Sequence, residues 1–435
     1  MRSGVVSADA PIPRTRGIVV AGVSWVALVV IAHLWGTALV RADPSIKLHA
    51  PPLFGHFDSR LGLKTVPAVM VALMVVVLGP LATRRLSWWG LVLVSTSSAV
   101  AWAVALAYVN GIDALTAPLE RSTEYLSVVP QVSSVSDFVA DYVDRLRSYP
   151  IHVKGHPPGA VVVLTWLERI GLGGSTWAAA LVIAAGACSV PAALSALRNL
   201  SSEERARRSA PFLVLAPAAL WIATSMDALF AGVSAVAVAL VVVALTRSGL
   251  RSDLPAAAGG LLGGCALLLT YGAAPLAVIV AAVAVARRRV RPVAIAAAAT
   301  IAVLAAAAAW GFSWPQGLQA TGNLYRAGVA SDRPYAFFVV SNLAAFALVV
   351  GPAATAGLTR LFSDRGRVLV LGALVALIAA DLSGLSKGEV ERIWLPFAPW
   401  VLLAAGALPE RSTRAWLAVQ ALIALGIAVF VRTPW

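Results

Sequence analysis

The sequence predicts an all-α polytopic membrane protein with about 13 transmembrane helices and further helices at the outer membrane interface. The chain has 435 residues, of which 60% are apolar and only 12% are charged, a balance that excludes a soluble core. Many apolar runs are long enough to cross a hydrocarbon layer of about 30 Å, which needs roughly 20 helical residues. Clusters of arginine recur between alternate runs, as expected when successive helices cross in opposite directions.

The predicted spans are assigned from the length of each apolar run. The 17–40 run lacks a clear small-residue cleavage site, so we interpret it as a retained helix and not as a signal peptide. The spans are 17–40, 65–83, 88–109, 176–197, 210–225, 228–246, 255–272, 274–286, 292–311, 336–357, 368–384, 394–408 and 414–431.

The arginine distribution predicts the topology. Seven clusters fall on one face: Arg2, Arg14, Arg16; Arg84, Arg85; Arg198, Arg205, Arg207, Arg208; Arg247, Arg251; Arg287, Arg288, Arg289, Arg291; Arg360, Arg365, Arg367; and Arg411, Arg414. By the positive-inside rule this face is cytoplasmic, which predicts a multi-pass protein of the plasma (inner) membrane with a cytoplasmic N-terminus. This face holds the whole net charge of +14, whereas the outer face is neutral. The basic charge is therefore topological, and we expect no nucleic-acid partner.

The topology holds only if residues 157–171 do not span the membrane. This segment carries Glu168 and Arg169 and is about 15 residues long, so it is interpreted as an interfacial or re-entrant helix. Ahead of it, Ser136 is the expected N-cap of a helix over 137–148 that lies flat on the membrane. The apolar stripe of that helix is Phe138, Val139, Tyr142, Val143 and Leu146.

Three parts of the chain are predicted. Residues 1–16 form a cytoplasmic tail, and residues 17–87 form an N-terminal transmembrane hairpin with an outer loop. Residues 88–435 form the transmembrane core, which includes the long outer loop 110–175. A long charged loop between hydrophobic spans is more often a functional site than a simple connection.

Charged residues gather in several outer segments. The main ones are Arg121–Leu126 with Glu124 and Tyr125, His152–Gly159 with Lys154 and His156, Thr224–Leu229 with Asp227, and Ser386–Trp400 with Glu391 and Arg392. A smaller one, Asn323–Tyr335, contains Arg333.

The order of these segments resembles the membrane glycosyltransferases of the GT-C fold, especially the protein O-mannosyltransferase and lipid A aminoarabinose transferase branch. Those enzymes have an acidic motif after a span, then a Lys-Pro-Pro-Leu-type segment, a Thr-Asp-Met motif, an Arg-Pro-aromatic turn and an Arg-aromatic-x-x-Pro-x-x-Pro motif. The counterparts here are Glu124-Tyr125, His156-Pro157-Pro158-Gly159, Thr224–Asp227, Arg333-Pro334-Tyr335 and Arg392–Pro399. The chain departs from the pattern where His156 replaces lysine and Gly159 replaces leucine.

The resemblance implies an inverting transfer of a sugar from a polyprenyl-phosphate donor. Glu124 is then the expected general base, with Asp227 as a second catalytic acid. Lys154, His156, Arg333, Glu391, Arg392 and Tyr125 are the expected substrate-binding residues, and Arg392 suits phosphate because its planar fork matches the phosphate oxygens. The expected partners are membrane lipid, the polyprenyl-phosphate sugar and a glycan or lipid acceptor of the cell envelope.

Simpler structural roles are the alternatives. Glu124 can pair with Arg121, Arg392 can pair with Glu389 or Glu391, and Asp227 can stabilise a helix N-terminus. Asp43 and Asp58 in the first outer loop are the alternative base. A cofactor is not assigned: Glu124 with His152 or His156 could hold a divalent ion, but no closed set of metal ligands is present.

Two other classes of protein fit the composition. A lipid or solute transporter or flippase would need charged residues near the bilayer midplane or broken helices. A non-catalytic membrane assembly subunit would keep the fold without the base.

Overall fold

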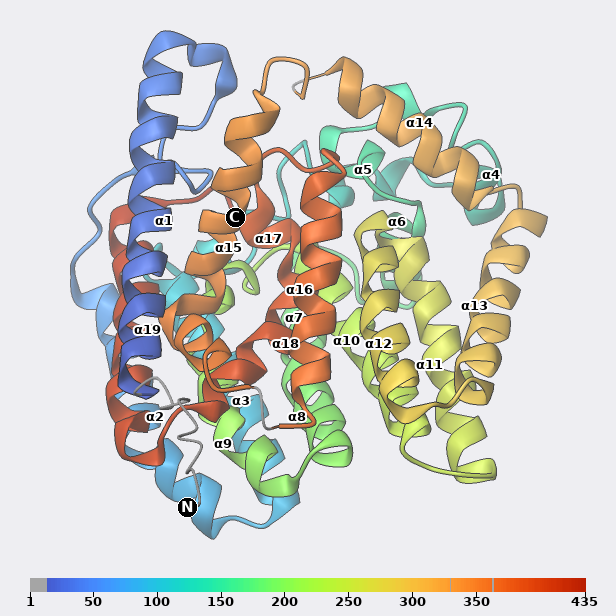
Figure 1. Cartoon of the computed structure of the whole chain (residues 1–435). Coiled ribbons are helices and arrows are strands. Elements are labelled where there is room, and N and C mark those ends of the chain that lie inside the picture. Colours follow the sequence, from blue (N-terminus) through green and yellow to red (C-terminus); the bar gives the residue numbers. More distant parts are fainter. Residues whose placement is uncertain (1–13, 329, 362–363) are drawn as a thin grey trace, which may run out of the picture.

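The computed structural model describes residues 14–328, 330–361 and 364–435. The predicted cytoplasmic tail 1–16 lies almost wholly outside the described residues. The fold is helical, as predicted, with one two-stranded ribbon in the described part of the chain (Figure 1). The helices are α1 (Arg14–Ala42), α2 (Val66–Arg85), α3 (Trp88–Tyr108), α4 (Val135–Ala140), α5 (Ile151–Lys154), α6 (Gly159–Arg169), α7 (Ser175–Ala187), α8 (Ser189–Leu200), α9 (Glu203–Val214), α10 (Met226–Leu245), α11 (Leu250–Leu269), α12 (Ala277–Arg287), α13 (Arg291–Ala309), α14 (Trp314–Ala327), α15 (Tyr335–Leu358), α16 (Arg367–Leu382), α17 (Val390–Ile393), α18 (Ala398–Leu402) and α19 (Thr413–Phe430).

Nine helical segments of the described chain are long and apolar enough to cross a membrane, which confirms a polytopic membrane protein. Each matches one predicted span. The segments are Arg16–Ala42, Leu63–Arg85, Trp88–Tyr108, Ser175–Leu200, Met226–Leu245, Leu250–Leu269, Arg291–Ala309, Tyr335–Leu358 and Glu410–Phe430.

The other four predicted spans are shorter or interrupted. The 274–286 span lies within the short apolar segment Tyr271–Arg287, and the 368–384 span corresponds to the 16-residue helix α16. The segments predicted as spans over 210–225 and 394–408 are not continuous helices. The first breaks after Val214 into the 3-10 turn Pro217–Trp221, and the second is a series of short turns around α18. Proline causes both breaks, because it has no N–H to donate.

The helices pack into one body. Helix α1 lies along α15, while α2 contacts α3, α9 and α19, so the first two helices both join the rest of the bundle. Helix α10 lies at the centre against α7, α8 and α11, and α13 packs on the outer side of α11 (Figure 1). This central position brings the N-terminus of α10, which carries Asp227, under the long outer loop.

The polar loops gather at one end of the bundle, here called the loop end, where α4, α5 and α14 lie (Figure 1). Several arginine clusters meet near α9, toward the other end. Arg84 pairs with Glu410 at 2.6 Å, and Arg205 pairs with Asp364 at 2.6 Å. Their grouping agrees with the prediction that these clusters share one face.

The predicted surface helix over 137–148 is wrong in length. The helix is α4, only six residues long, and its N-cap is Ser134, whose hydroxyl oxygen accepts from the Asp137 N–H. The predicted apolar stripe is largely buried, but against the protein itself and not against the membrane: Phe138, Tyr142 and Leu146 belong to a core under the loop end.

The predicted non-spanning helix after Pro157-Pro158 is α6, with 11 residues. It packs closely on α11, since a Cβ atom on Gly159 would lie only 2.4 Å from the Leu268 carbonyl oxygen. The close approach explains why a glycine follows Pro157-Pro158.

The first outer loop joins the last residues of the sequence. Strands β1 (His56–Phe57) and β2 (Val431–Arg432) pair antiparallel, with His56 opposite Arg432. The ribbon places Phe54 and Trp435 beside each other at the loop end, near α17.

Candidate functional site

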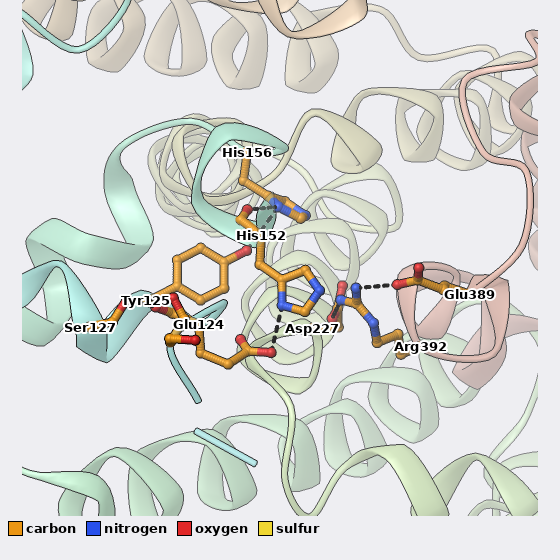
Figure 2. Close-up of polar contacts among 9 residues, drawn as sticks. Glu124, Tyr125, Ser127, His152, His156, Asp227, Glu389 and Arg392 are labelled. Atoms are coloured by element: carbon orange, nitrogen blue, oxygen red, sulfur yellow. Dashed lines mark hydrogen bonds and ion pairs between the residues drawn. The ribbon is translucent and has the colours of Figure 1, made fainter. Parts of the chain in front are cut away.

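Glu124 forms a close pair with His152 (Figure 2). Glu124 stands at the start of a short 3-10 turn, and His152 lies on α5, further along the same loop. The His152 Nδ1–H donates to Glu124 Oε1 at 2.5 Å, and both side chains are largely shielded from solvent. A carboxylate that holds one imidazole nitrogen leaves the other, Nε2, free to exchange a proton with a ligand.

His156 lies close to Tyr125 in the same pocket of side chains (Figure 2). Its Nδ1 is 2.9 Å from the His152 carbonyl oxygen and 2.8 Å from the Tyr125 hydroxyl. A carbonyl oxygen only accepts, so Nδ1 carries a proton and Nε2 is the unprotonated nitrogen of the neutral ring. Burial lowers the pKa of His156, and the nearby Asp227 carboxylate does not reverse this shift. His156 is therefore suited to accept a hydrogen bond, and not to supply a positive charge.

Arg392 is held between two carboxylates (Figure 2). Its Nη1–H donates to Asp227 at 2.6 Å and its Nη2–H donates to Glu389 at 2.7 Å. Asp227 and Arg392 are 3% and 5% exposed. Burial opposes the charge of Arg392, but Asp227, Glu389 and Glu124 outweigh it and raise the pKa of the guanidinium. Arg392 is thus a fixed positive charge at the loop end.

The turn before α17 places Glu389 toward Arg392. Gly388 and Glu389 both have positive φ, of 89° and 61°, and Asn342 accepts from the Gly388 N–H. Burial acts to raise the pKa of Glu389, but the charge of Arg392 and its hydrogen bond outweigh it and lower that pKa. The local backbone therefore serves to keep an ionised carboxylate next to the guanidinium.

Aromatic rings cover the other side of Arg392. The Arg392 Cζ lies 4.4 Å from the centre of the Trp435 ring, a cation–π contact, and the Trp435 ring is stacked on Phe54 with centroids 5.6 Å apart. The Phe54 N–H donates to Glu391 Oε1 at 2.9 Å. Burial raises the pKa of Glu391 to about 7. The first outer loop is thereby attached both to α17 and to Trp435.

Four residues from distant parts of the sequence meet at the loop end. Glu124, His156, Asp227 and Arg392 lie in one region, and each senses the charge of at least one other (Figure 2). Glu124, Asp227 and Glu389 bring three carboxylates against one guanidinium. The cluster is thus richer in acid than in base.

Other predicted residues make no hydrogen bond to this cluster in the described part of the chain. Arg333 is buried, but its guanidinium donates to the Ile46 and Lys387 carbonyl oxygens and so connects two loops. Lys154 follows His152 on α5, and its ammonium has no hydrogen-bond partner in the described part of the chain. Asp43 and Asp58 are exposed; hydrogen bonds from Ser45 lower the pKa of Asp43. The alternative assignment of Asp43 or Asp58 as the base stays a prediction.

Sequence reasoning named His152 only as a possible ion ligand with Glu124 and Glu389 only as a possible ion-pair partner of Arg392, and it did not name Phe54 or Trp435. His152 has a usable signal, since it precedes His156 by four residues, the spacing of one helical turn. Glu389 has the same kind of signal, three residues before Arg392. Phe54 and Trp435 have none, because contacts between opposite ends of a chain leave no local pattern.

No group of three or more His, Cys, Asp or Glu side chains is placed to hold a metal ion among the described residues. A small apolar cavity of about 40 Å³ lies nearby, between α3, α7, α8 and α18. It is lined by Ala231, one turn after Asp227, and by Leu395, three residues after Arg392.

No protein-family model matches the chain, and no curated protein matches it. Among solved structures, the chain is similar to ArnT from Cupriavidus metallidurans in the apo state, with 17% sequence identity and a TM-score of 0.45. The match covers 72% of this chain and 60% of ArnT, so the chain spans less than two thirds of the length of ArnT. So distant a likeness carries no argument for activity.

Proposed function

We propose that the protein is a glycosyltransferase that moves a sugar from a polyprenyl-phosphate donor to an extracytoplasmic acceptor of the cell envelope. The observation that carries the proposal is the Glu124–His152 pair, which stands beside the fixed charge of Arg392 at the loop end of a membrane bundle. The proposal places the loop end outside the plasma membrane and the N-terminus in the cytoplasm.

Transfer to a hydroxyl needs a group that takes the hydroxyl proton. Glu124 can accept it directly, or His152 can accept it at Nε2 while Glu124 stabilises the imidazolium through Nδ1. Both roles use the 2.5 Å contact between the two side chains. We assign proton acceptance to the pair as a unit, and we assign His156 to orient the acceptor through its unprotonated Nε2.

The departing phosphate needs positive charge. Arg392 supplies a charge that does not move, because Asp227, Glu389 and Trp435 hold it in place. Two of its donors are already used by Asp227 and Glu389, whose negative charges offset that of Arg392 at a distance, so Arg392 alone does not hold the phosphate. Lys154, whose ammonium is free of partners in the described structure, is assigned to contact the phosphate oxygens directly.

The lipid tail of the donor stays in the bilayer. The nine apolar helical segments of the described chain offer such a tail an apolar environment beside the loop end.

The Glu124→Gln variant tests the proposal. It keeps the size of the side chain but loses the ability to take a proton, so transfer should fall by about 10²–10⁴-fold while donor binding changes little. The assay follows transfer from polyprenyl-phosphate sugars by the purified protein. Glu168→Gln, an exposed acid on α6, is the matched control. Full transfer by Glu124→Gln would contradict the assignment.

A transporter is the second candidate, because the 210–225 and 394–408 segments are broken in the way that transporter helices often are. The same variant separates the two functions. If Glu124→Gln still moves a polyprenyl-phosphate sugar across vesicles while the wild type shows no transfer, the protein is a transporter.

A further inference from the structure

Three buried polar atoms around α17 have no hydrogen-bond partner in the described part of the chain: Glu391 Oε2, Arg392 Nε and Trp435 Nε1. Their side chains belong to one contact group. Glu391 and Arg392 are neighbours on α17, and the Trp435 ring lies 4.4 Å from the Arg392 Cζ. Buried polar atoms without partners are costly, so three in one group indicate a place for a polar part of a ligand.

The hydrogen-bonding capacity of the three atoms identifies the ligand group. Arg392 Nε–H and Trp435 Nε1–H can only donate, whereas Glu391 accepts once its carboxyl is ionised, above its pKa of about 7. A hydroxyl has two lone pairs and one hydrogen, so it satisfies two donors and one acceptor at once. A phosphate dianion has no hydrogen for Glu391, and an apolar group satisfies none of the three.

We propose that Glu391, Arg392 and Trp435 form a subsite for one hydroxyl group of a carbohydrate, either on the donor sugar or on the acceptor. The inference rests on the proposed function, which supplies carbohydrate ligands to this end of the molecule. The subsite adds selectivity to a reaction centre that lies at Glu124.

The first outer loop holds this subsite in shape. Phe54 uses its N–H to fix Glu391 Oε1, which leaves Oε2 for the ligand, and its ring stacks on Trp435. Both the acceptor and one of the donors are thus positioned by a single residue. A site with fixed, buried hydrogen-bonding groups strongly rejects analogues that lack the matching hydroxyl.

The test measures binding to the purified full-length protein in a detergent without sugar. The donor probes are glucose, mannose, galactose and arabinose, each linked to polyprenyl phosphate, and the acceptor probes are the methyl glycosides of the same sugars. The tightest binder is then replaced by its monodeoxy analogues. In the wild type, loss of the one matching hydroxyl should weaken binding by about 5- to 150-fold.

Two variants remove one partner each. Trp435→Phe keeps the ring over Arg392 and loses only the N–H, and Glu391→Gln keeps the acceptor for Phe54 and replaces Oε2 with a donor. Each variant should bind the parent sugar more weakly than the wild type does. In each variant, removing the matching hydroxyl from the sugar should then weaken binding little further. Trp89→Phe, at a position that is 76% exposed, is the control and should bind like the wild type.

The outcomes are distinct. The subsite is overturned if each deoxy analogue binds more weakly than the parent sugar by the same factor in the wild type and in both variants. It is also overturned if no probe binds. Coupled losses without any sugar transfer support the subsite and reject the proposed glycosyltransferase. Transfer without coupled losses supports the enzyme and rejects the subsite.

Discussion

Asp227 and Arg392 are 165 residues apart in the sequence and share a 2.6 Å ion pair that is almost completely buried. Helix α10 supplies the carboxylate from the centre of the bundle, and α17 supplies the guanidinium from a short turn at the loop end. Since a buried charge is costly without its partner, each of these residues depends on the other.

Arg392→Met should therefore lower the free energy of unfolding by about 3–5 kcal/mol, because it leaves Asp227 and Glu389 as unpaired buried charges. The double variant with Asp227→Asn should recover part of this loss. Unfolding of the purified protein in detergent measures both. Arg84→Gln is the control: its partner Glu410 is half exposed, so the loss should stay within about 1 kcal/mol. Equal losses in Arg392→Met and Arg84→Gln would contradict the buried pair.

His152→Gln should reduce transfer nearly as much as Glu124→Gln, because the two side chains act on one proton. The double variant should be little worse than either single one, as for residues that work as a unit. Steady-state transfer rates of the three variants provide the measurement. Asp43→Asn and Asp58→Asn should leave the rate almost unchanged. If either of these two abolishes transfer and Glu124→Gln does not, the base lies in the first outer loop.

Glu391 should make stability depend on pH. The pKa of Glu391 in the folded protein is about 7, against an ordinary value of 4.5. As pH rises from about 4.5 to 7 the unfolded chain loses this proton first, so the folded state should lose about 3 kcal/mol of stability over that range and change little above it. Below pH 4.5 Glu391 is protonated in both the folded and the unfolded chain, so it causes no loss of stability there.

Melting temperatures of wild type and Glu391→Gln between pH 4 and 8 measure this effect. The variant, which has no proton to lose, should show a smaller decline with pH than the wild type. Glu168→Gln should follow the wild-type curve. Parallel curves for wild type and Glu391→Gln would mean that Glu391 does not titrate in this range.

Accessibility to an impermeant thiol reagent should reveal the topology. In a chain with Cys188 and Cys265 changed to Ala, Ser136→Cys at the loop end should react in intact cells. Glu204→Cys, beside the arginine clusters, should react only after the cells are broken. Both positions are exposed, so access alone decides the result. The reverse pattern would invert the proposed orientation.

Gly159→Ala should be destabilising by about 1–3 kcal/mol, since the added methyl group would meet the Leu268 carbonyl oxygen and force α6 away from α11. Gly22→Ala is the matched control, because nothing lies within 4 Å of a Cβ atom there. Thermal unfolding compares the two. Equal stability of the two variants would mean that α6 can move without cost.

Much of the architecture follows from hydropathy and charge, because a helix that crosses a membrane must be apolar over its whole length. The interrupted segments were harder to predict: Pro217, Pro396 and Pro399 break runs that remain fully apolar. Average hydropathy does not register such a break.

The site was predictable only in part. Charged residues such as Glu124 and Arg392 stand out in an apolar chain, so their selection needed no structure. The sequence could not show which carboxylate pairs with Arg392. Glu389 and Glu391 are close to Arg392 in the sequence, and Asp227 was expected on the same outer face. In the structure Arg392 pairs with Asp227 and Glu389, whereas Glu391 accepts a hydrogen bond from the Phe54 N–H.

The contact of Phe54 with Glu391 and Trp435 has a consequence for biosynthesis. A ribosome makes the first outer loop early, α17 much later and β2 after α17, and the chain is inserted into the membrane as it grows. Phe54 can stack on Trp435 only after β2 has been made. A nascent chain can therefore have its helices up to α19 in the bilayer while the contact group of Glu391, Arg392 and Trp435 is still incomplete.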